Sequence, residues 1–269
     1  NDSTAVDRNS RIGFKGSEDL GNGMKAVWHI ETDVSDAAWG DRPVFVGLTG
    51  DFGTFAMGRQ YAPYKVSTGK LDMFADTIGD YNAVIGAQSG AGGANFETYA
   101  SAVAYVTPTV NGFHAAIARG SIAGATDSDA WSMAAVYSNG PLYAALGYET
   151  QDSLLAVDQD AWKAGIGYSF GNSKVGFVYE NIDNDNANSD TDNFILNFGH
   201  KFGANTFKIQ YGDSDVDNGA DADYWAVGLD HAFSKRTKVY AIYADAEAGL
   251  SLNNGRWGNG NNTAYNNDA

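Results

Sequence analysis

The stretch WKAGIGYSFGN, residues Trp162–Asn172, decides the fold because its large and small side chains alternate with a period of two. In an extended strand this spacing places Trp162, Ile166 and Phe170 on one face, and the other face is small or polar. The Gly171-Asn172 dipeptide then turns the chain, since tight hairpin turns need residues that accept positive φ values. The pattern predicts a β-hairpin with one aromatic face and one small or polar face.

The same unit recurs along most of the chain and predicts about fourteen strands. The expected runs start at Asn9 and continue with Met24–Asp33, Pro43–Gly50, Thr54–Arg59, Thr98–Thr107, Phe113–Gly120, Trp131–Tyr137, Leu142–Tyr148, Trp162–Phe170, Val175–Tyr179, Phe194–Phe202, Phe207–Tyr211, Trp225–Phe233 and Thr237–Tyr243. Short turns near residues 22, 52, 110, 140, 172, 204 and 235 alternate with longer polar connections. This alternation is typical of an all-β, antiparallel up-and-down barrel with two unlike rims.

The distribution of aromatic residues bears on which face of the sheet meets water. A soluble sandwich buries its aromatic face, whereas a membrane barrel turns that face to lipid and lines water with the other. Trp131 and Tyr137 bracket one strand, and Trp162 and Phe170 bracket another, as two interfacial girdles require. We therefore expect a transmembrane barrel, with a soluble all-β carbohydrate-binding module as the alternative.

This assignment of the two faces predicts how substitutions on each face affect stability. Arg in place of Leu146 or Ile166 lies on the lipid face and is expected to destabilise the barrel. Ser in place of Gly165 lies on the water-lining face and is expected to be tolerated.

The composition excludes several classes of function. With 33 Asp and Glu against 17 Lys and Arg, the net charge of −16 excludes a nucleic-acid partner, which requires a basic face. The absence of Cys excludes disulfides and thiol catalysis. The chain contains no run of about 18 apolar residues, so no transmembrane helix is predicted. A transmembrane strand needs only about ten residues of alternating character.

No motif predicts an enzyme, a cofactor or a metal site. The four His residues are scattered without ligand spacing, and no Ser/His/Asp arrangement or carboxylate pair stands out. The acidic residues of 183–192, namely Asp183, Asp185, Asp190 and Asp192, lack the Gly and the terminal Glu of a calcium loop and are interpreted as a solvated loop.

One connection, Arg59–Phe96, is far longer than the others and is expected to be functional. Met73, Phe74 and Ile78 give it an apolar side that can pack. Its acidic residues Asp72, Asp76 and Asp80 recur at i, i+4 and i+8, so one or two helical turns would align them. A loop that packs on one side and presents carboxylates on the other predicts a constriction.

The two ends of the chain, Asn1–Arg8 and Ala246–Ala269, are polar and fall on the long-loop side. A barrel that ended there would leave unpaired backbone groups in lipid. We therefore interpret residues 1–269 as a single barrel domain and expect two further strands, one at each edge, to close it.

Five stretches resemble the general diffusion porins of Gram-negative outer membranes, most closely the neisserial-type family. They are Ser10–Trp28, Trp39–Leu48, Gly58-Arg59, Ala104–Pro108 and Phe233–Thr237. The resemblance implies a sixteen-stranded barrel in the outer membrane, a homotrimer, and a third loop folded into the pore. It also implies outer-membrane lipid and lipopolysaccharide as surroundings, and small hydrophilic solutes and ions as cargo that diffuse passively.

The resemblance further implies a basic cluster that faces the loop carboxylates Asp72, Asp76 and Asp80. Its members here are Arg11, Lys15, Arg42 and Arg59. Relatives place a further Arg on the strand where this chain has Ala104 and Val106. Losing that cation while keeping three carboxylates predicts a modest preference for cations.

Overall fold

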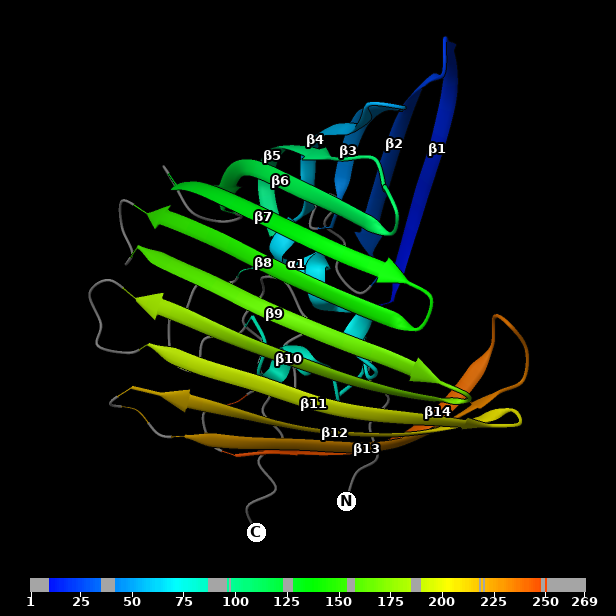
Figure 1. The fold of residues 1–269 in the computed structure, drawn as a ribbon, viewed down its shortest axis with the longest axis vertical. Coiled ribbons are helices and arrows are strands. Elements are labelled where there is room, and N and C mark those ends of the chain that lie inside the picture. The colour runs from blue at the N-terminus through cyan, green and yellow to red at the C-terminus, as the bar shows by residue number, and fades with distance from the viewer. Residues whose placement is uncertain are drawn as a thin grey trace.

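The computed structural model describes residues 10–34, 42–86, 96, 98–122, 128–153, 158–184, 190–217, 219, 221–247 and 250. Within them, fourteen antiparallel strands form one sheet in which each strand pairs with the next along the chain. The sheet curves around the connection that follows the fourth strand (Figure 1). In the described part of the chain, no helix is long and apolar enough to cross a membrane.

The strand bounds agree with the sequence-based prediction to within a few residues at most ends. They are β1 (Arg11–Gly21), β2 (Met24–Asp33), β3 (Val44–Gly50), β4 (Gly53–Tyr61), β5 (Thr98–Val106), β6 (Phe113–Ile122), β7 (Ser128–Asn139), β8 (Leu142–Ser153), β9 (Gln159–Phe170), β10 (Ser173–Asn184), β11 (Thr191–Phe202), β12 (Asn205–Val216), β13 (Ala222–Ala232) and β14 (Lys238–Ala246).

The predicted hairpin turns are confirmed. Asn22 and Asn111 both have a φ of 51°, and Gly140, Gly171 and Gly203 have φ values of 56°, 55° and 60°. These are the left-handed conformations that Gly and Asn adopt most readily. Each turn therefore sits where the dipeptide pattern predicted it.

The apolar face of the sheet points away from its interior, as predicted for a membrane barrel. Leu146, Ile166 and Trp162 are exposed by 59%, 52% and 44%, whereas their sequence neighbours Ala145 and Lys163 are exposed by only 5% and 2%. A soluble protein would bury such side chains. The apolar side chains therefore lie on the outer face of the sheet, as in a barrel surrounded by lipid.

The long connection between β4 and β5 lies inside the curved sheet, where α1 (Pro63–Thr68) is visible in Figure 1. Two short 3₁₀ turns follow, η1 (Gly69–Leu71) and η2 (Tyr81–Ala83). Their apolar side chains share one cluster with the wall, formed by Leu71, Phe74, Tyr81, Ala83, Val84, Ile85, Val178, Ile195, Tyr224 and Ala226. The expected packing is confirmed for Phe74 and for Met73, which lies against this cluster, whereas Ile78 is not part of it. The loop supplies much of the buried apolar core.

The expected helical alignment of the three loop carboxylates is wrong. No α-helix covers residues 72–80, and Asp76 has a φ of 62°, which interrupts any right-handed turn. Asp72 and Asp80 instead lie together, whereas Asp76 points to the opposite wall of the pore.

Glycines on the inner face of the sheet make room for the loop. A Cβ atom at Gly165 would lie 2.6 Å from Leu71 Cδ1 and 2.8 Å from Thr68 Cγ2, and one at Gly167 would lie 2.6 Å from Leu71 Cδ2. Gly165 therefore contacts the loop rather than water, which corrects its assignment to the water-lining face and removes the reason given for tolerance of Ser.

Strands β1 and β14 form the two edges of the sheet and lie apart in Figure 1. Among the described residues, no pairing joins one to the other. The two closing strands, and with them the count of sixteen, remain a prediction.

Candidate constriction site

A cavity of about 360 Å³ separates the loop from the wall formed by the first strands of the sheet. Ionisable side chains from both sides line it, namely Arg11, Arg42, Tyr61, Lys65, Lys70, Asp72, Asp76, Asp80 and Tyr81. Opposite charges thus face each other across the narrow part of the interior. This is the arrangement expected of a constriction.

Arg11 and Asp76 span this gap. Arg11 Nη2 lies 2.9 Å from Asp76 Oδ2, and Nη1 lies 3.3 Å from Oδ1, so the pairing is bidentate. The backbone N–H of Asp76 donates to Asp80 Oδ2 at 3.0 Å, which holds the turn with its positive φ. Because the two side chains are 40% and 45% exposed, the pair contributes little to stability but fixes the position of both charges.

Arg42 is held more tightly. Its Nε donates to Glu31 Oε1 at 2.6 Å and its Nη2 donates to the Tyr61 hydroxyl at 2.8 Å, with the Arg side chain only 5% exposed. Glu31 therefore neutralises most of the charge that Arg42 brings to the cavity. Glu31 was not among the residues predicted for the site.

Asp72 and Asp80 form a carboxyl pair beside Lys65. Burial raises the pKa of Asp72 well above its usual range, and the neighbouring Asp80 raises it further. Burial also raises the pKa of Asp80, although backbone N–H groups of Asn82 and Asp76 oppose the shift. Burial lowers the pKa of Lys65 to about 8. Asp72 and Asp80 therefore bind protons more readily than isolated, solvent-exposed carboxylates would.

Two of the predicted basic residues lie outside the lining of this cavity. Lys15 is opposite His29 in the β1–β2 pair, and Arg59 is opposite Val44 beside a bulge in β4. Of the four predicted cations, the structure brings Arg11 and Arg42 to the loop carboxylates. A role for Lys15 and Arg59 in the pore remains a prediction.

Sequence reasoning missed Lys65 and Lys70, the cations that the loop itself supplies. Both follow β4 within the connection that was expected to form the constriction, so the signal was present. Only the acidic residues of this loop were predicted to belong to the site. With Lys65 and Lys70 included, cations and carboxylates around the cavity are nearly balanced.

Glu180 anchors the loop at two points. It accepts hydrogen bonds from the Tyr64 hydroxyl at 2.6 Å, from the backbone N–H of Gly86 at 2.7 Å and from Asn193 Nδ2 at 3.0 Å. Glu180 is completely buried, so these donors replace the water that its carboxylate loses. Residues at both ends of the described loop are thus tied to one side chain of β10.

Further polar side chains of the wall hold the middle of the loop. Asn197 Nδ2 donates to the Leu71 carbonyl at 2.7 Å, and Gln210 Nε2 donates to the Gly79 carbonyl at 3.1 Å. Lys163 Nζ lies 4.0 Å from the centre of the Tyr64 ring. The alternation along their strands places Asn197, Gln210 and Lys163 on the small or polar face, which was expected to line water. That interpretation is wrong because the loop covers them.

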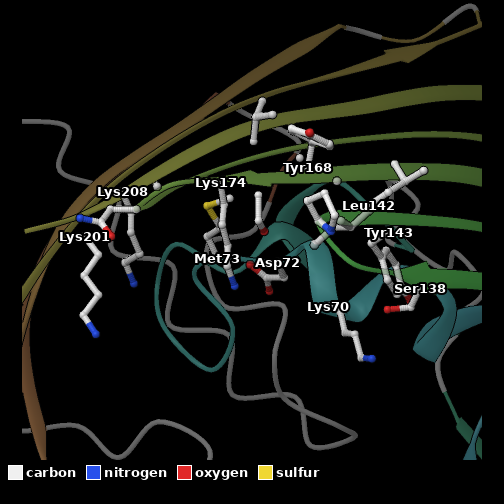
Figure 2. Close-up of a pocket in the computed structure, with 18 of the residues that line it drawn as sticks. Lys70, Asp72, Met73, Ser138, Leu142, Tyr143, Tyr168, Lys174, Lys201 and Lys208 are labelled. Carbon is white, nitrogen blue, oxygen red and sulfur yellow. The ribbon is translucent and has the colours of Figure 1, made fainter. Parts of the chain in front are cut away.

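A second cavity, of about 490 Å³, lies between the loop and the short turns of β7–β12. Figure 2 shows Lys70, Lys174, Lys201 and Lys208 on its margin, with Asp72 and Met73 of the loop between them. None of the three wall lysines was singled out in the sequence.

The acidic segment 183–192 is only partly described, since Asp185 lies outside the described residues. Within the described part, the Asp192 carboxylate accepts hydrogen bonds from the Tyr179 hydroxyl and from Asn181 Nδ2. In the described residues no cluster of metal-ligating side chains occurs, here or elsewhere.

Comparison with known proteins identifies similar chains. A family model described as Gram-negative porin matches residues 1–249. The major outer membrane protein P.IB of Neisseria meningitidis serogroup B is 30% identical over 265 residues, which cover 87% of this chain and 75% of that protein.

Solved structures resemble the fold over most of its length. The anion-selective porin from Comamonas acidovorans has a TM-score of 0.80 and 26% identity, with 90% of this chain and 80% of that chain covered. OmpT of Vibrio cholerae, described in a trimer form, has a TM-score of 0.70 and 17% identity, with coverage of 89% and 81%, and supports the fold alone.

Proposed function

Because the chain belongs to the Gram-negative porin family and is a β-barrel protein of the outer membrane, we propose that it serves passive diffusion of small hydrophilic solutes and ions. The observation that carries the proposal is a charged cavity on the inner side of a curved sheet whose apolar face points outward. Such a sheet suits lipid outside and water inside. With this location, the alternative of a soluble carbohydrate-binding module is set aside.

The charges at the constriction support selection by size and charge rather than catalysis. The relatives are porins, which are channels and not enzymes, and we propose no reaction for this chain. Arg11 and Asp76 are in direct contact at the margin of the cavity, so a passing solute meets both signs of charge within one narrow section. Hydrated polar solutes pass such a section more easily than apolar solutes of the same size.

We propose a modest preference for cations, as expected from the sequence, but with a different origin. The near balance of charges at the constriction gives little preference by itself. The net charge of −16 places an acidic excess elsewhere in the chain, and acidic mouths would enrich cations at low salt. The preference would fade as salt rises, because screening shortens the range of these charges.

A preference for anions is the alternative. The Comamonas acidovorans porin is anion-selective by description, and it is similar to this chain in structure and, at 26% identity, in sequence. Lys65 and Lys70 at the cavity favour the same outcome here. We propose, in addition, a homotrimer embedded in outer-membrane lipid and lipopolysaccharide, in line with the trimer form of the related fold.

Planar-bilayer recordings test this function. The purified protein is expected to form open channels whose conductance rises with salt, and reversal potentials in a salt gradient give the sign of the preference. Replacing both Asp76 and Asp80 by Asn is expected to lower the permeability of cations relative to anions. Absence of channels would overturn the function. An anion-preferring wild type, or a double variant with unchanged selectivity, would overturn the proposed cation preference.

A further inference from the structure

The cavity of about 490 Å³ beside the short turns has a composition unlike that of the constriction. Residues 70–73 of the loop form one side, and the ends of β7–β12 near their short turns form the other. In Figure 2 the side chains of Lys70, Lys174, Lys201 and Lys208 extend in the same direction, away from the strands above them. Four ammonium groups thus border one space, with Asp72 as its acidic member.

Three of these ammonium groups lack an ionic partner in the part of the chain that the structure describes. Lys208 Nζ lies 3.0 Å from Asp230 Oδ1, and Lys238 shares the same carboxylate at 3.1 Å. No ion pair to Lys70, Lys174 or Lys201 occurs among the described residues. Like charges that border one space repel one another, so an anion placed among them lowers their free energy.

Apolar residues of the loop line one side of this cavity. Leu71 is 5% exposed, and Met73 lies against the same wall. The Tyr143 hydroxyl donates to the Ser67 carbonyl at 2.5 Å, which holds its ring beneath Lys70 Nζ at 5.5 Å from the ring centre. The cavity therefore combines cations with an ordered apolar surface, the composition of sites for small organic anions.

This cavity differs in charge from the β12–β13 connection at the opposite ends of the strands. The described ends of the β12–β13 connection, on the long-loop side, contain Asp213, Asp215, Asp217, Asp221 and Asp223. On the short-turn side the cavity is bordered by lysines instead. An anion that passes the constriction from the side of this connection thus meets a group of positive charges at the cavity.

We propose that this cavity binds a small phosphorylated solute, with the phosphate dianion held by Lys174 and Lys201 and the organic part against Met73 and Tyr143, toward Lys70. Lysine binds phosphate as a point charge, and a dianion gains twice the Coulomb energy of a monovalent anion. The proposal rests on the proposed channel only in that the solute reaches the cavity through the pore.

Glycerol 3-phosphate is the probe, with glycerol as the uncharged comparison. In planar bilayers in potassium chloride, glycerol 3-phosphate is expected to reduce the chloride-carried current in a saturable way, whereas glycerol has no such effect. Replacing Lys174 and Lys201 together by Gln is expected to weaken this inhibition by about tenfold, with roughly threefold for each lysine. Both side chains are exposed, so the fold is expected to survive.

The matched control is the double variant Lys235→Gln and Arg236→Gln. It removes two positive charges from the exposed β13–β14 turn on the same rim, but neither residue lines the cavity. Its affinity for glycerol 3-phosphate is expected to equal that of the wild type. Equal losses in the two double variants would overturn the site, because they would indicate a general effect of surface charge.

Phosphorus NMR of glycerol 3-phosphate with the detergent-solubilised protein separates this proposal from the proposed function. Broadening of the phosphate signal by the wild type, and its loss in the Lys174/Lys201 variant, supports the site even where no channel is recorded. Channels that conduct potassium chloride without any broadening or inhibition would overturn the site and leave the channel function standing.

Discussion

The hydroxyl of Tyr64 donates a hydrogen bond of 2.6 Å to Glu180 Oε1, although Glu180 lies 116 positions further along the chain. Both side chains are fully buried between the loop and the wall. Since Glu180 also accepts from the backbone of Gly86, one carboxylate holds the start and the end of the described loop. The position of the constriction therefore depends on a residue that does not line it.

Replacing Tyr64 by Phe is expected to loosen this anchor. The substitution removes one hydrogen bond to a buried carboxylate, which contributes about 1.5–3 kcal/mol to the free energy of unfolding. Urea unfolding measures the loss, and open-channel current noise is expected to increase. Tyr240→Phe is the control, since Tyr240 is 47% exposed on β14. Equal destabilisation by both substitutions would contradict the anchoring role.

The pairing of Arg11 with Asp76 makes opposite predictions for its two members. Arg11→Gln leaves a carboxylate uncompensated and is expected to raise cation over anion permeability, whereas Asp76→Asn is expected to lower it. Reversal potentials measure both, and the double variant is expected to return close to the wild type. Lys15→Gln serves as the comparison because Lys15 lies outside the cavity lining. A larger effect from Lys15→Gln than from Arg11→Gln would show that the constriction lies elsewhere.

Selectivity is expected to depend on pH in two steps. As pH falls, Asp72 and Asp80 gain a proton at a higher pH than ordinary carboxyls, because burial raises the pKa of both, and cation preference falls. As pH rises through about 8, Lys65 loses its charge and cation preference increases. Reversal potentials between pH 4 and pH 10 follow both steps. Lys65→Gln is expected to abolish the upper step alone, and a wild type without that step would refute the assignment.

Gly165→Ser is expected to disturb the constriction from the wall side. Its Cβ would lie 2.6 Å from Leu71 Cδ1, so the loop must shift, and overpacking of this kind costs about 1–3 kcal/mol. Thermal unfolding and single-channel conductance are both expected to change. Gly69→Ala is the matched control, since Gly69 has a φ of −57° and nothing within 4 Å of a Cβ. Identical behaviour of the two variants would contradict the packing of the loop on this wall.

Leu146→Arg tests the orientation of the sheet. Leu146 is 59% exposed on the outer face, and an Arg near the middle of the membrane destabilises a barrel by about 2–4 kcal/mol. Unfolding in lipid vesicles measures the loss. Arg119→Leu is the reverse comparison, because Arg119 already lies exposed beside Asp129 and its replacement is expected to cost far less. A neutral Leu146→Arg would mean that the faces are reversed.

Local chemistry was enough to predict the strands and their turns. The alternation in Trp162–Phe170 reflects the two faces of any extended chain, and the positive φ values of Asn22 and Gly171 follow from residues that tolerate them. Neither depends on distant parts of the chain. The sequence by itself therefore determined the antiparallel strand order, the outward apolar face and the long inserted loop.

The tertiary structure alone decided which inner residues meet water and which meet the loop. Glu180, Asn197 and Lys163 have the same polar alternation as any water-lining residue, and only the course of the loop buries them. Likewise, the resemblance implied only that a basic cluster with Arg11 faces the loop carboxylates, and the structure decided that Arg11 pairs with Asp76, 65 positions along the chain. A period of two specifies a face but not what covers it, because the covering segment is positioned by packing and hydrogen bonds between residues far apart in the sequence.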